Sequence, residues 1–449
     1  MATPEKNTDA VYDASTLGTP KMLVLGLQHL FAMFGATVLV PAITGLNVST
    51  TLLFAGLGTL LFHLITGRKV PAFLGSSFAF LGAYGLATAS GQDIPLTYSC
   101  FGVAVAGLVY LVLALFFKLF GAKKVMRFFP PIVTGPIIIA IGLNLSSSAI
   151  NNCAQNWWIA MVAIVIIIAA NIWGKGMIKI IPILLGVVGS YIVAVIATLC
   201  GAQLPDANGV MQPLVNFVSV GEAHLIGLQK FVIAKFDVSA ILVMAPIAIA
   251  AMMEHIGDIS AISSTTGKNF IEDPGLHRTL VGDGLATAFA GMFGGPANTT
   301  YGENTGVLAL SKIYDPLVIR IAAVLAIILS FSPKFEAVIN TIPTGIIGGI
   351  SFVLYGMISA IGVRNVVENR VDFTNSRNLI VAAVILVSAL GFNSVGGLTF
   401  MVGSVSINLS GLAIAAIVGI LLNAILPGND YEFDAADGSD AATSGNLQV

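Results

Sequence analysis

The sequence predicts an all-α polytopic membrane protein with fourteen transmembrane spans, and three observations support this fold class. Hydrophobic residues make up 56% of the 449 positions and charged residues only 9%, whereas a soluble domain carries about a quarter charged residues. The mean hydropathy is +0.94. The basic residues also alternate with the apolar segments so that nearly all of them fall on one side of a bilayer.

The composition excludes several other classes of protein. Three cysteines are too few and too scattered for a secreted disulfide scaffold. The net charge of −2 and the lack of a long basic run give no support for nucleic-acid binding. We find no pattern of a metal-ligand cluster, a nucleophile–base pair or a phosphate-binding loop, so the sequence predicts neither an enzyme nor a cofactor.

Apolar stretches long enough to cross about 30 Å of hydrocarbon delimit the spans. The polar segment 1–20 lacks the order of a signal peptide and is expected to be a cytosolic tail. Segment 428–449 has five acidic residues and no basic one and is expected to be a second, disordered cytosolic tail. The spans between them are expected at residues 23–43, 50–66, 71–88, 97–120, 132–148, 158–173, 180–200, 238–261, 279–294, 302–313, 317–332, 336–362, 378–392 and 406–426.

The positive-inside rule tests this count independently. With a cytosolic N-terminus, only Lys230, Lys235 and Lys334 of the 20 basic residues lie outside. Adding or removing one span would scramble the alternation further along the chain. We therefore expect fourteen spans with both termini cytosolic.

The two halves of seven spans show internal likeness, and because seven is odd this predicts an inverted repeat. Three correspondences occur in the same order: Gln28-His29 with Glu254-His255, Ser76-Ser77-Phe78 with Thr299-Thr300-Tyr301, and PPIVTGPIII (130–139) with IPTGIIGGI (342–350).

The third and tenth spans are interrupted by Gly, Pro and polar residues, in segments 67–88 and 291–313. Backbone can leave a helix at membrane depth only where protein, water or substrate satisfies its polar groups. Interrupted segments in matching positions of two halves indicate a binding site near the bilayer midplane. The alternative is a pair of ordinary kinked, packed helices.

Three acidic residues are expected within the membrane: Glu254, Asp258 and Glu303. Glu254 and Asp258 are four positions apart and share a helix face. A charged side chain at the bilayer centre costs roughly 2.5–3.5 kcal/mol and normally faces a cavity. Alternatively, Asp258 is a solvated or capping residue near the cytosolic end, and Glu303 only accepts backbone N–H bonds.

Other polar residues have more ordinary interpretations. Asp283 is expected at a helix start or between helices. His255 points about 100° away from Glu254 and need not share its cavity. His29 either packs in the core without a functional role or supports the interrupted segments. His63, near a helix end, is expected at the membrane interface.

The predicted cavity offers two carboxylate acceptors, Glu254 and Glu303, and aromatic faces from Phe78 and Tyr301, with no Lys or Arg at the same depth. An anionic substrate is therefore disfavoured. A neutral planar molecule with alternating N–H donors and C=O acceptors fits, such as a nucleobase or another cyclic amide.

The chain resembles the nucleobase–ascorbate (nucleobase:cation symporter 2) family, and within it the bacterial uracil permeases. The resemblance runs along the whole chain in the motifs QHLFAMFGATVLVP (28–41), PAFLGSSFAF (71–80), DPGLHR (273–278), NTTYGENTGV (298–307) and the opening of the twelfth span.

The resemblance implies a core domain of spans 1–4 and 8–11, here 21–130 and 238–334. It implies a gate domain of spans 5–7 and 12–14, here 131–237 and 335–427, through which homodimers form. Spans 3 and 10 would each contribute a short strand, and substrate would bind between them at the boundary of the two domains.

The resemblance also implies the roles of site residues. Glu254 and Glu303 correspond to the carboxylates that hydrogen-bond uracil, and Phe78 and Gly302 to backbone contacts. Ser77 and Tyr301 lie beside these contacts. The remaining implied residues are the proton-coupling pair Asp258 and Glu254 and the supporting residues Gln28, His29 and Asn304.

Two departures from the family pattern bear on these expectations. Asp258 stands where the enterobacterial uracil permeases have His, which implies a different pH range for coupling. In the signature Glu303-Asn304-Thr305-Gly306, Ser311 replaces a later Thr, and Glu303 in place of Gln favours uracil over xanthine or urate. The expected function is proton-coupled uracil uptake across the inner (cytoplasmic) membrane; the alternatives are a purine symporter of the same fold and, more distantly, a channel.

Overall fold

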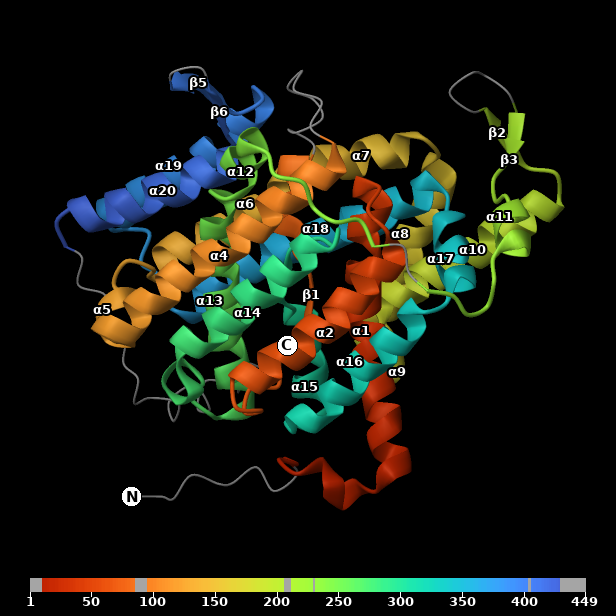
Figure 1. Ribbon diagram of the computed structural model, residues 1–449, viewed down its shortest axis with the longest axis horizontal. Coiled ribbons are helices and arrows are strands. Elements are labelled where there is room, and N and C mark those ends of the chain that lie inside the picture. The colour runs from red at the N-terminus through yellow and green to blue at the C-terminus, as the bar shows by residue number, and fades with distance from the viewer. Residues whose placement is uncertain (1–9, 85–94, 206–210, 229–230, 403–404, 429–449) are drawn as a thin grey trace.

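The computed structural model describes residues 10–84, 95–205, 211–228, 231–402 and 405–428, and within them the chain is mostly helical (Figure 1). The first half contains η1 (Ala14–Leu17), α1 (Thr19–Thr44), α2 (Val48–Ile65), β1 (Leu74–Ser76), η2 (Phe78–Phe80), α4 (Leu96–Phe120), α5 (Ala122–Met126), α6 (Pro131–Asn144), α7 (Ser146–Ala154), α8 (Trp157–Ile172), α9 (Met177–Ile180), α10 (Pro182–Leu199), β2 (Gln203–Pro205), β3 (Met211–Pro213) and α11 (Val218–Glu222).

The second half follows the same scheme of helices with a few short strands. It contains α12 (Val238–Met244), α13 (Ile247–Thr266), η3 (Ile271–Gly275), α14 (Leu276–Met292), β4 (Asn298–Thr300), α15 (Gly302–Ser311), α16 (Pro316–Ser330), α17 (Pro333–Asn340), α18 (Thr344–Glu368), α19 (Ser376–Ser394), β5 (Leu398–Val402), β6 (Val405–Leu409) and α20 (Gly411–Ile425).

The helices follow the order of the apolar segments predicted from the sequence, but several of those segments differ in detail. Segment 71–88 contains β1 and η2, and its residues 85–88 lie outside the described residues. Segment 132–148 is divided between α6 and α7. Segment 238–261 is divided between α12 and α13, and segment 336–362 between α17 and α18. The last helix begins at Gly411 and not at 406, because residues 405–409 form β6, paired antiparallel with β5.

Local sequence fixes several helix ends. The side chains of Asn47, Asp315 and Asn375 each accept a backbone N–H in the first turn of α2, α16 and α19, which satisfies a donor that the helix itself leaves unpaired. α1 and α13 end at Gly45 and Gly267, both in the left-handed conformation that glycine adopts without strain.

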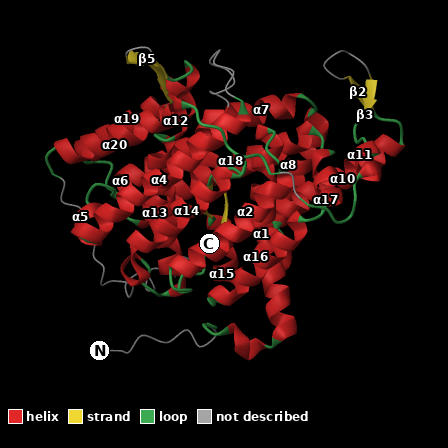
Figure 2. Ribbon diagram, in the orientation of Figure 1, coloured by secondary structure: helices red, strands yellow, loops and turns green. Residues whose placement is uncertain are grey.

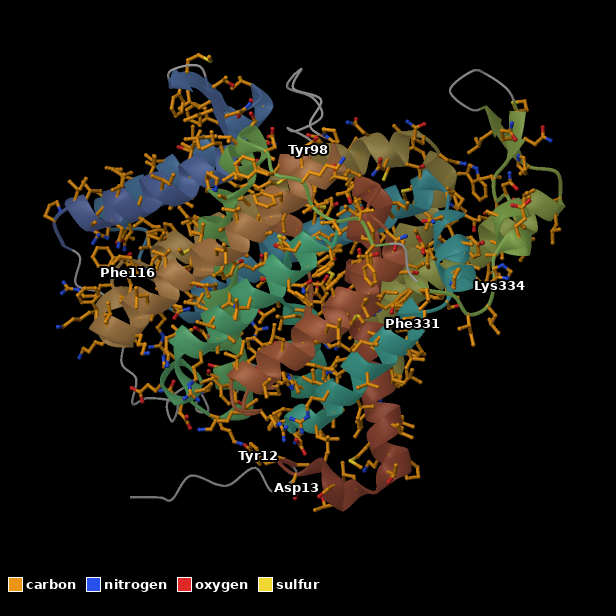
Figure 3. All side chains as sticks on the ribbon, viewed as in Figure 1. Tyr12, Asp13, Tyr98, Phe116, Phe331 and Lys334 are labelled. Carbon is orange, nitrogen blue, oxygen red and sulfur yellow. The ribbon has the colours of Figure 1, made fainter. Side chains whose placement is uncertain are left out.

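Long apolar helices and an apolar exterior indicate that the protein lies in a membrane. Among the described residues, eight helices are long and apolar enough to span a membrane, or nine if the bent pair α16–α17 is one span. One face of α4 exposes a stripe of large apolar side chains: Leu108, Val112, Leu115, Phe116 and Leu119. Phe116, at the outer edge of the molecule in Figure 3, is 49% exposed. A water-soluble monomer rarely exposes such a stripe, whereas a helix that contacts lipid does.

A two-stranded sheet lies at the centre of the bundle. β1 and β4 pair antiparallel with Gly75 opposite Thr299, and every residue of both strands is buried. Figure 2 shows a short strand in the middle of the molecule, surrounded by helices. The two segments predicted to be interrupted thus contain the strands that meet, and each satisfies backbone groups of the other.

The helices around this sheet pack in pairs that are distant in sequence. α14 lies along α4, α16 along α2, and α18 along α6. α13 contacts β4, α15, α6 and α20. As a result, α13 and the β1–β4 pair face α6 and α18 across the middle of the molecule.

Replacing Gly75 with alanine is expected to destabilise this centre. A Cβ at position 75 would overlap the Tyr301 ring and lie 2.8 Å from Thr37 Oγ1, and overpacking of this kind costs about 1–3 kcal/mol. We expect a lower midpoint of thermal unfolding for the purified protein in detergent. Gly82→Ala is the matched control, because a Cβ there meets open space; equal losses in both variants would contradict this account of the packing.

Candidate functional site

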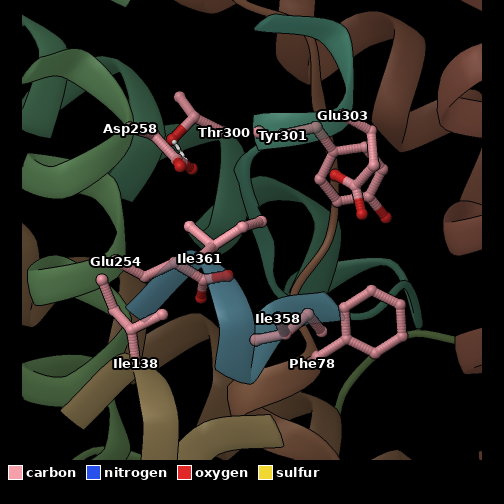
Figure 4. A pocket seen from close by; sticks show the side chains of 10 residues that line it. Phe78, Ile138, Glu254, Asp258, Thr300, Tyr301, Glu303, Ile358 and Ile361 are labelled. Atoms are coloured by element: carbon pink, nitrogen blue, oxygen red, sulfur yellow. Dashed lines mark hydrogen bonds between the residues drawn. The ribbon is translucent and has the colours of Figure 1, made fainter. Parts of the chain in front are cut away.

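A cavity of about 30 Å³ lies where α13, the end of β4 and the start of α15 approach α6 and α18. It is enclosed on most sides, and Figure 4 shows carboxylate and apolar side chains converging on it. The lining residues are Phe78, Ile138, Glu254, Asp258, Thr300, Tyr301, Gly302, Glu303, Ile358 and Ile361.

The strand pair places the aromatic residues of the site. The Tyr301 N–H donates to Phe73 O at 3.0 Å, and the Ser77 N–H donates to Ala297 O at 2.8 Å. The Tyr301 hydroxyl donates to Ser76 O at 2.9 Å. These bonds fix Tyr301 and the neighbouring Phe78 at the points where the chain leaves the two strands.

Helix α13 supplies two carboxylates, one turn apart. Glu254 and Asp258 both line the cavity, as their spacing of four residues predicts. Thr300 Oγ1 donates to Asp258 Oδ2 at 3.0 Å, the dashed line in Figure 4. Glu254 Oε2 is buried and has no hydrogen-bond partner among the described residues. A buried acceptor without a donor is costly, so this oxygen is suited to a ligand N–H group.

Glu303 brings a third carboxylate, from the first turn of α15. The exposed N–H groups of a helix start favour negative charge at that position. Figure 4 places the Glu303 carboxylate beside the Tyr301 ring, across the cavity from Asp258.

The side chains that line the cavity carry three carboxylates and no Lys, Arg or His. An anion would therefore meet three carboxylates and no basic side chain there. A neutral molecule with N–H donors, or a proton shared with a carboxylate, suits this lining.

Residues 20–398 match the permease family Xan_ur_permease. The chain belongs to this family. The match confirms the resemblance to the nucleobase–ascorbate transporters and makes the protein a permease and not an enzyme. As a permease with several long apolar helices, it is a multi-pass membrane protein.

Curated relatives of the permease cover nearly its whole length. It is 42% identical over 423 residues to the "Probable uracil permease" of Haemophilus influenzae, covering 91% of this chain and 94% of that one. It is 39% identical over 420 residues to the "Uracil permease" of Bacillus subtilis, covering 89% and 91%. It is also 40% identical over 411 residues to the "Putative pyrimidine permease RutG" of Escherichia coli, covering 90% and 89%.

Solved structures show the same fold at much lower identity. The transmembrane domain of the cyanobacterial bicarbonate transporter BicA matches with a TM-score of 0.61 and 15% identity, covering 92% of the permease and 99% of that chain. SLC26A9 matches with a TM-score of 0.63 and 11% identity, covering 92% and 66%. The permease therefore has a helical membrane-transporter fold.

Six of the ten residues predicted for the site line the cavity, and four do not. Glu254, Asp258, Glu303, Tyr301, Gly302 and Phe78 all line it. Ser77 is buried beside it but is not part of the lining, and the Nε2 of Gln28 approaches the Met177 sulfur at 2.6 Å, away from the cavity. Because neighbouring helix positions diverge by about 100°, Gln28 and His29 cannot face the same way.

His29 and Asn304 support the site from behind, as a pair. The Asn304 side-chain amide lies 3.1 Å from His29 Nδ1 and donates to His29 O at 3.2 Å, and both residues are buried. This contact ties α1 to α15 next to Glu303.

Two other histidines are also accounted for. His255 Nδ1 lies 2.9 Å from Asp283 Oδ2, with both side chains fully buried and outside the cavity lining. His63 is buried, with Nε2 2.9 Å from Ala72 O. His63 lies in the last turn of α2, near a helix end as expected, and it is buried in the protein. Its place at the membrane interface stays a prediction.

Replacing Asn304 with leucine is expected to remove both hydrogen bonds to His29 and to leave the buried Nδ1 of that ring without a partner. The cost of such a loss is about 1–3 kcal/mol, so the midpoint of thermal unfolding in detergent should fall. Asn369→Leu, at an exposed position, should change the midpoint little. A midpoint for Asn304→Leu equal to that of the control would show that the contact does not support the fold.

The structure adds residues that sequence reasoning missed. Ile138, Ile358 and Ile361 form the apolar side of the cavity, and Thr300 holds Asp258. Thr300 belongs to the polar run of the interrupted segment, which is a usable signal. The three isoleucines lie in continuous apolar helices and carry no distinguishing signal.

Proposed function

We propose that the permease takes up uracil together with protons across the inner (cytoplasmic) membrane by alternating access. The observation that carries this proposal is the cavity in which Glu254 and Glu303 face a space with no basic side chain in its lining. The names of the relatives support uracil as the substrate.

Uracil complements this cavity group by group. It is neutral and planar, and each of its two N–H groups can donate to a carboxylate. Such charge-assisted hydrogen bonds are about twice as strong as neutral ones. The rings of Phe78 and Tyr301 and the three isoleucines can enclose its faces and exclude water.

The crowding of three carboxylates supports proton coupling. Glu254, Asp258 and Glu303 would repel one another if all were ionised in one low-dielectric cavity. A proton on Asp258 or Glu254 removes charge from the cavity and lowers the cost of moving the occupied site through the membrane. Asp258, which already accepts a bond from Thr300, would then hold the transported proton while Glu254 and Glu303 hold uracil.

We assign segments 21–130 and 238–334 to a moving core domain and segments 131–237 and 335–427 to a gate domain. Together they would cross the membrane fourteen times as an inverted repeat, with both termini in the cytosol and the gate domains forming a homodimer. In this assignment Glu254, Asp258, Tyr301 and Glu303 belong to the core, and Ile138, Ile358 and Ile361 to the gate. The site would thus open and close as the two domains separate.

The size of the cavity is consistent with a closed stage of this cycle. A cavity needs about 10–15 Å³ to hold one water, so about 30 Å³ admits water but not a pyrimidine ring. Binding therefore requires the gate isoleucines to move away from the carboxylates.

Uptake of radiolabelled uracil into proteoliposomes, driven by an imposed proton gradient, tests the proposal. We expect saturable uptake that collapses when a protonophore is added. With one proton per neutral uracil, 100 mV supplies about 2.3 kcal/mol, enough for a roughly fifty-fold gradient. Uptake that xanthine or urate blocks better than unlabelled uracil would favour a purine symporter, and non-saturable flux would favour a channel.

A further inference from the structure

A second, larger cavity adjoins the candidate site. Its volume is about 210 Å³, against about 30 Å³ for the first. The two cavities share Gly302, Glu303, Ile358 and Ile361 in their walls. The second is further enclosed by residues of α1, α8, α9, α10 and α15. Its volume is roughly fifteen times what one water needs, which is a scale suited to a single-ring molecule.

The second cavity lies on the side assigned to the cytosol. Lys179 belongs to the α9 segment that follows the basic residue Lys175, and α15 runs from the shared wall to Lys312. Beyond Ile361, α18 reaches Arg364. These basic residues all fall on the inside by the positive-inside rule. In this orientation the second cavity lies on the cytosolic side of the candidate site.

The polar side chains of the second cavity differ in kind from those of the first. Besides the shared Glu303, only Asn171 and Lys179 among its lining residues carry polar side chains. Both have N–H donors, and no hydrogen bond or ion pair occupies either side chain within the described part of the chain. Asn171 is half-buried, and Lys179 is exposed at the mouth. The first cavity presents acceptors, whereas the second adds donors.

We propose that the second cavity is an exit subsite for the neutral pyrimidinedione ring, in which Asn171 and Lys179 donate hydrogen bonds to its carbonyl oxygens. The inference rests on the proposed function and adds a second binding site for the transported ring. Glu303, which faces both cavities, accepts a ring N–H in each. The ring then moves from one binding site to the next without losing all its polar partners at once, a loss that would cost about 1–3 kcal/mol for each buried group left unpaired.

Cysteine protection tests whether the ring occupies this cavity. Gly306 lines it, and a Cβ there would meet open space, so Gly306→Cys should fold and expose its thiol to the cavity. The native cysteines Cys100, Cys153 and Cys200 are first replaced by serine or alanine. In inside-out vesicles, we expect a membrane-impermeant thiol reagent to modify position 306 and uracil to slow that reaction about tenfold or more.

Thr374→Cys is the matched control, because this residue is exposed in the loop after α18, between the basic residues Arg370 and Arg377, and lines neither cavity. Uracil should not change its rate of modification. An equal rate at position 306 with and without saturating uracil, in a protein that still transports uracil, would overturn the subsite.

Transport kinetics test the two donors. Asn171→Leu and Lys179→Met are each expected to raise the KM for uracil at the cytosolic face about tenfold, the effect of losing about 1.4 kcal/mol. The KM at the outer face should change less than twofold. Lys175→Met, which removes a neighbouring charge that does not line the cavity, should change neither value.

If Lys179 only anchored its helix in the membrane, Lys179→Met would change the amount of permease in the membrane. It would not make the KM for uracil at the cytosolic face differ from the KM at the outer face. Equal KM changes at both faces would contradict the subsite while leaving the proposed function intact. Absence of uracil transport by the unmodified permease would instead reject the proposed function itself.

Discussion

Glu254→Gln is expected to weaken uracil binding by one to two orders of magnitude. The Glu254 carboxylate lies in the cavity wall with Oε2 unpartnered among the described residues, and glutamine would offer a neutral amide with an extra donor in its place. Loss of a hydrogen bond to a charged group costs about 1.5–3 kcal/mol. The dissociation constant should therefore rise about 10- to 150-fold, as measured by equilibrium binding of radiolabelled uracil to the purified permease.

Glu272→Gln is the control, since it makes the same substitution at an exposed carboxylate outside the cavity. It should bind uracil as the unmodified permease does. Similar affinities for Glu254→Gln and Glu272→Gln would remove Glu254 from the binding site. Circular dichroism and elution volume of both variants verify that the protein remains folded.

Asp258→Asn is expected to preserve uracil binding but to prevent the accumulation of uracil by the proton gradient. Asparagine keeps an oxygen that can accept the Thr300 hydrogen bond, so the affinity for uracil should change less than about threefold. Without a titratable group at this position, the proton gradient no longer drives the substrate. Accumulation at 100 mV should fall from a limit of about fifty-fold to near equality of the two sides.

Counterflow of uracil between equal internal and external pools distinguishes this outcome from simple inactivation. We expect Asp258→Asn to retain counterflow while gradient-driven uptake is lost. Asp372→Asn, in an exposed loop, should retain both activities. Parallel loss of binding, counterflow and accumulation in Asp258→Asn would remove this residue as the coupling group.

The parts of the site that lie on regular helices could be predicted from the sequence. Glu254 and Asp258 share the cavity because four residues make slightly more than one helical turn. The family resemblance implies a short strand in each of spans 3 and 10 but not the pairing of β1 with β4, and strands of three residues carry no periodicity of their own.

Other features could not be predicted, for physical reasons that differ from residue to residue. Ile138, Ile358 and Ile361 lie in apolar helices, and the sequence does not show whether such an isoleucine faces lipid, a neighbouring helix or a cavity. His63 is buried because of a carbonyl nine residues away, a contact that depends on the path of the intervening chain. The last helix begins later than predicted because residues 405–409 form β6. An apolar strand and an apolar helix end are alike in composition, so the sequence does not distinguish them.

A structure of the permease bound to a brominated uracil tests the central assignment most directly. The anomalous signal of bromine locates the ring independently of its shape. The account predicts a peak in the cavity between α13 and α15, with the ring nitrogens within hydrogen-bonding distance of the carboxylates of Glu254 and Glu303. A peak elsewhere, or carboxylates turned away from the ring, would contradict it.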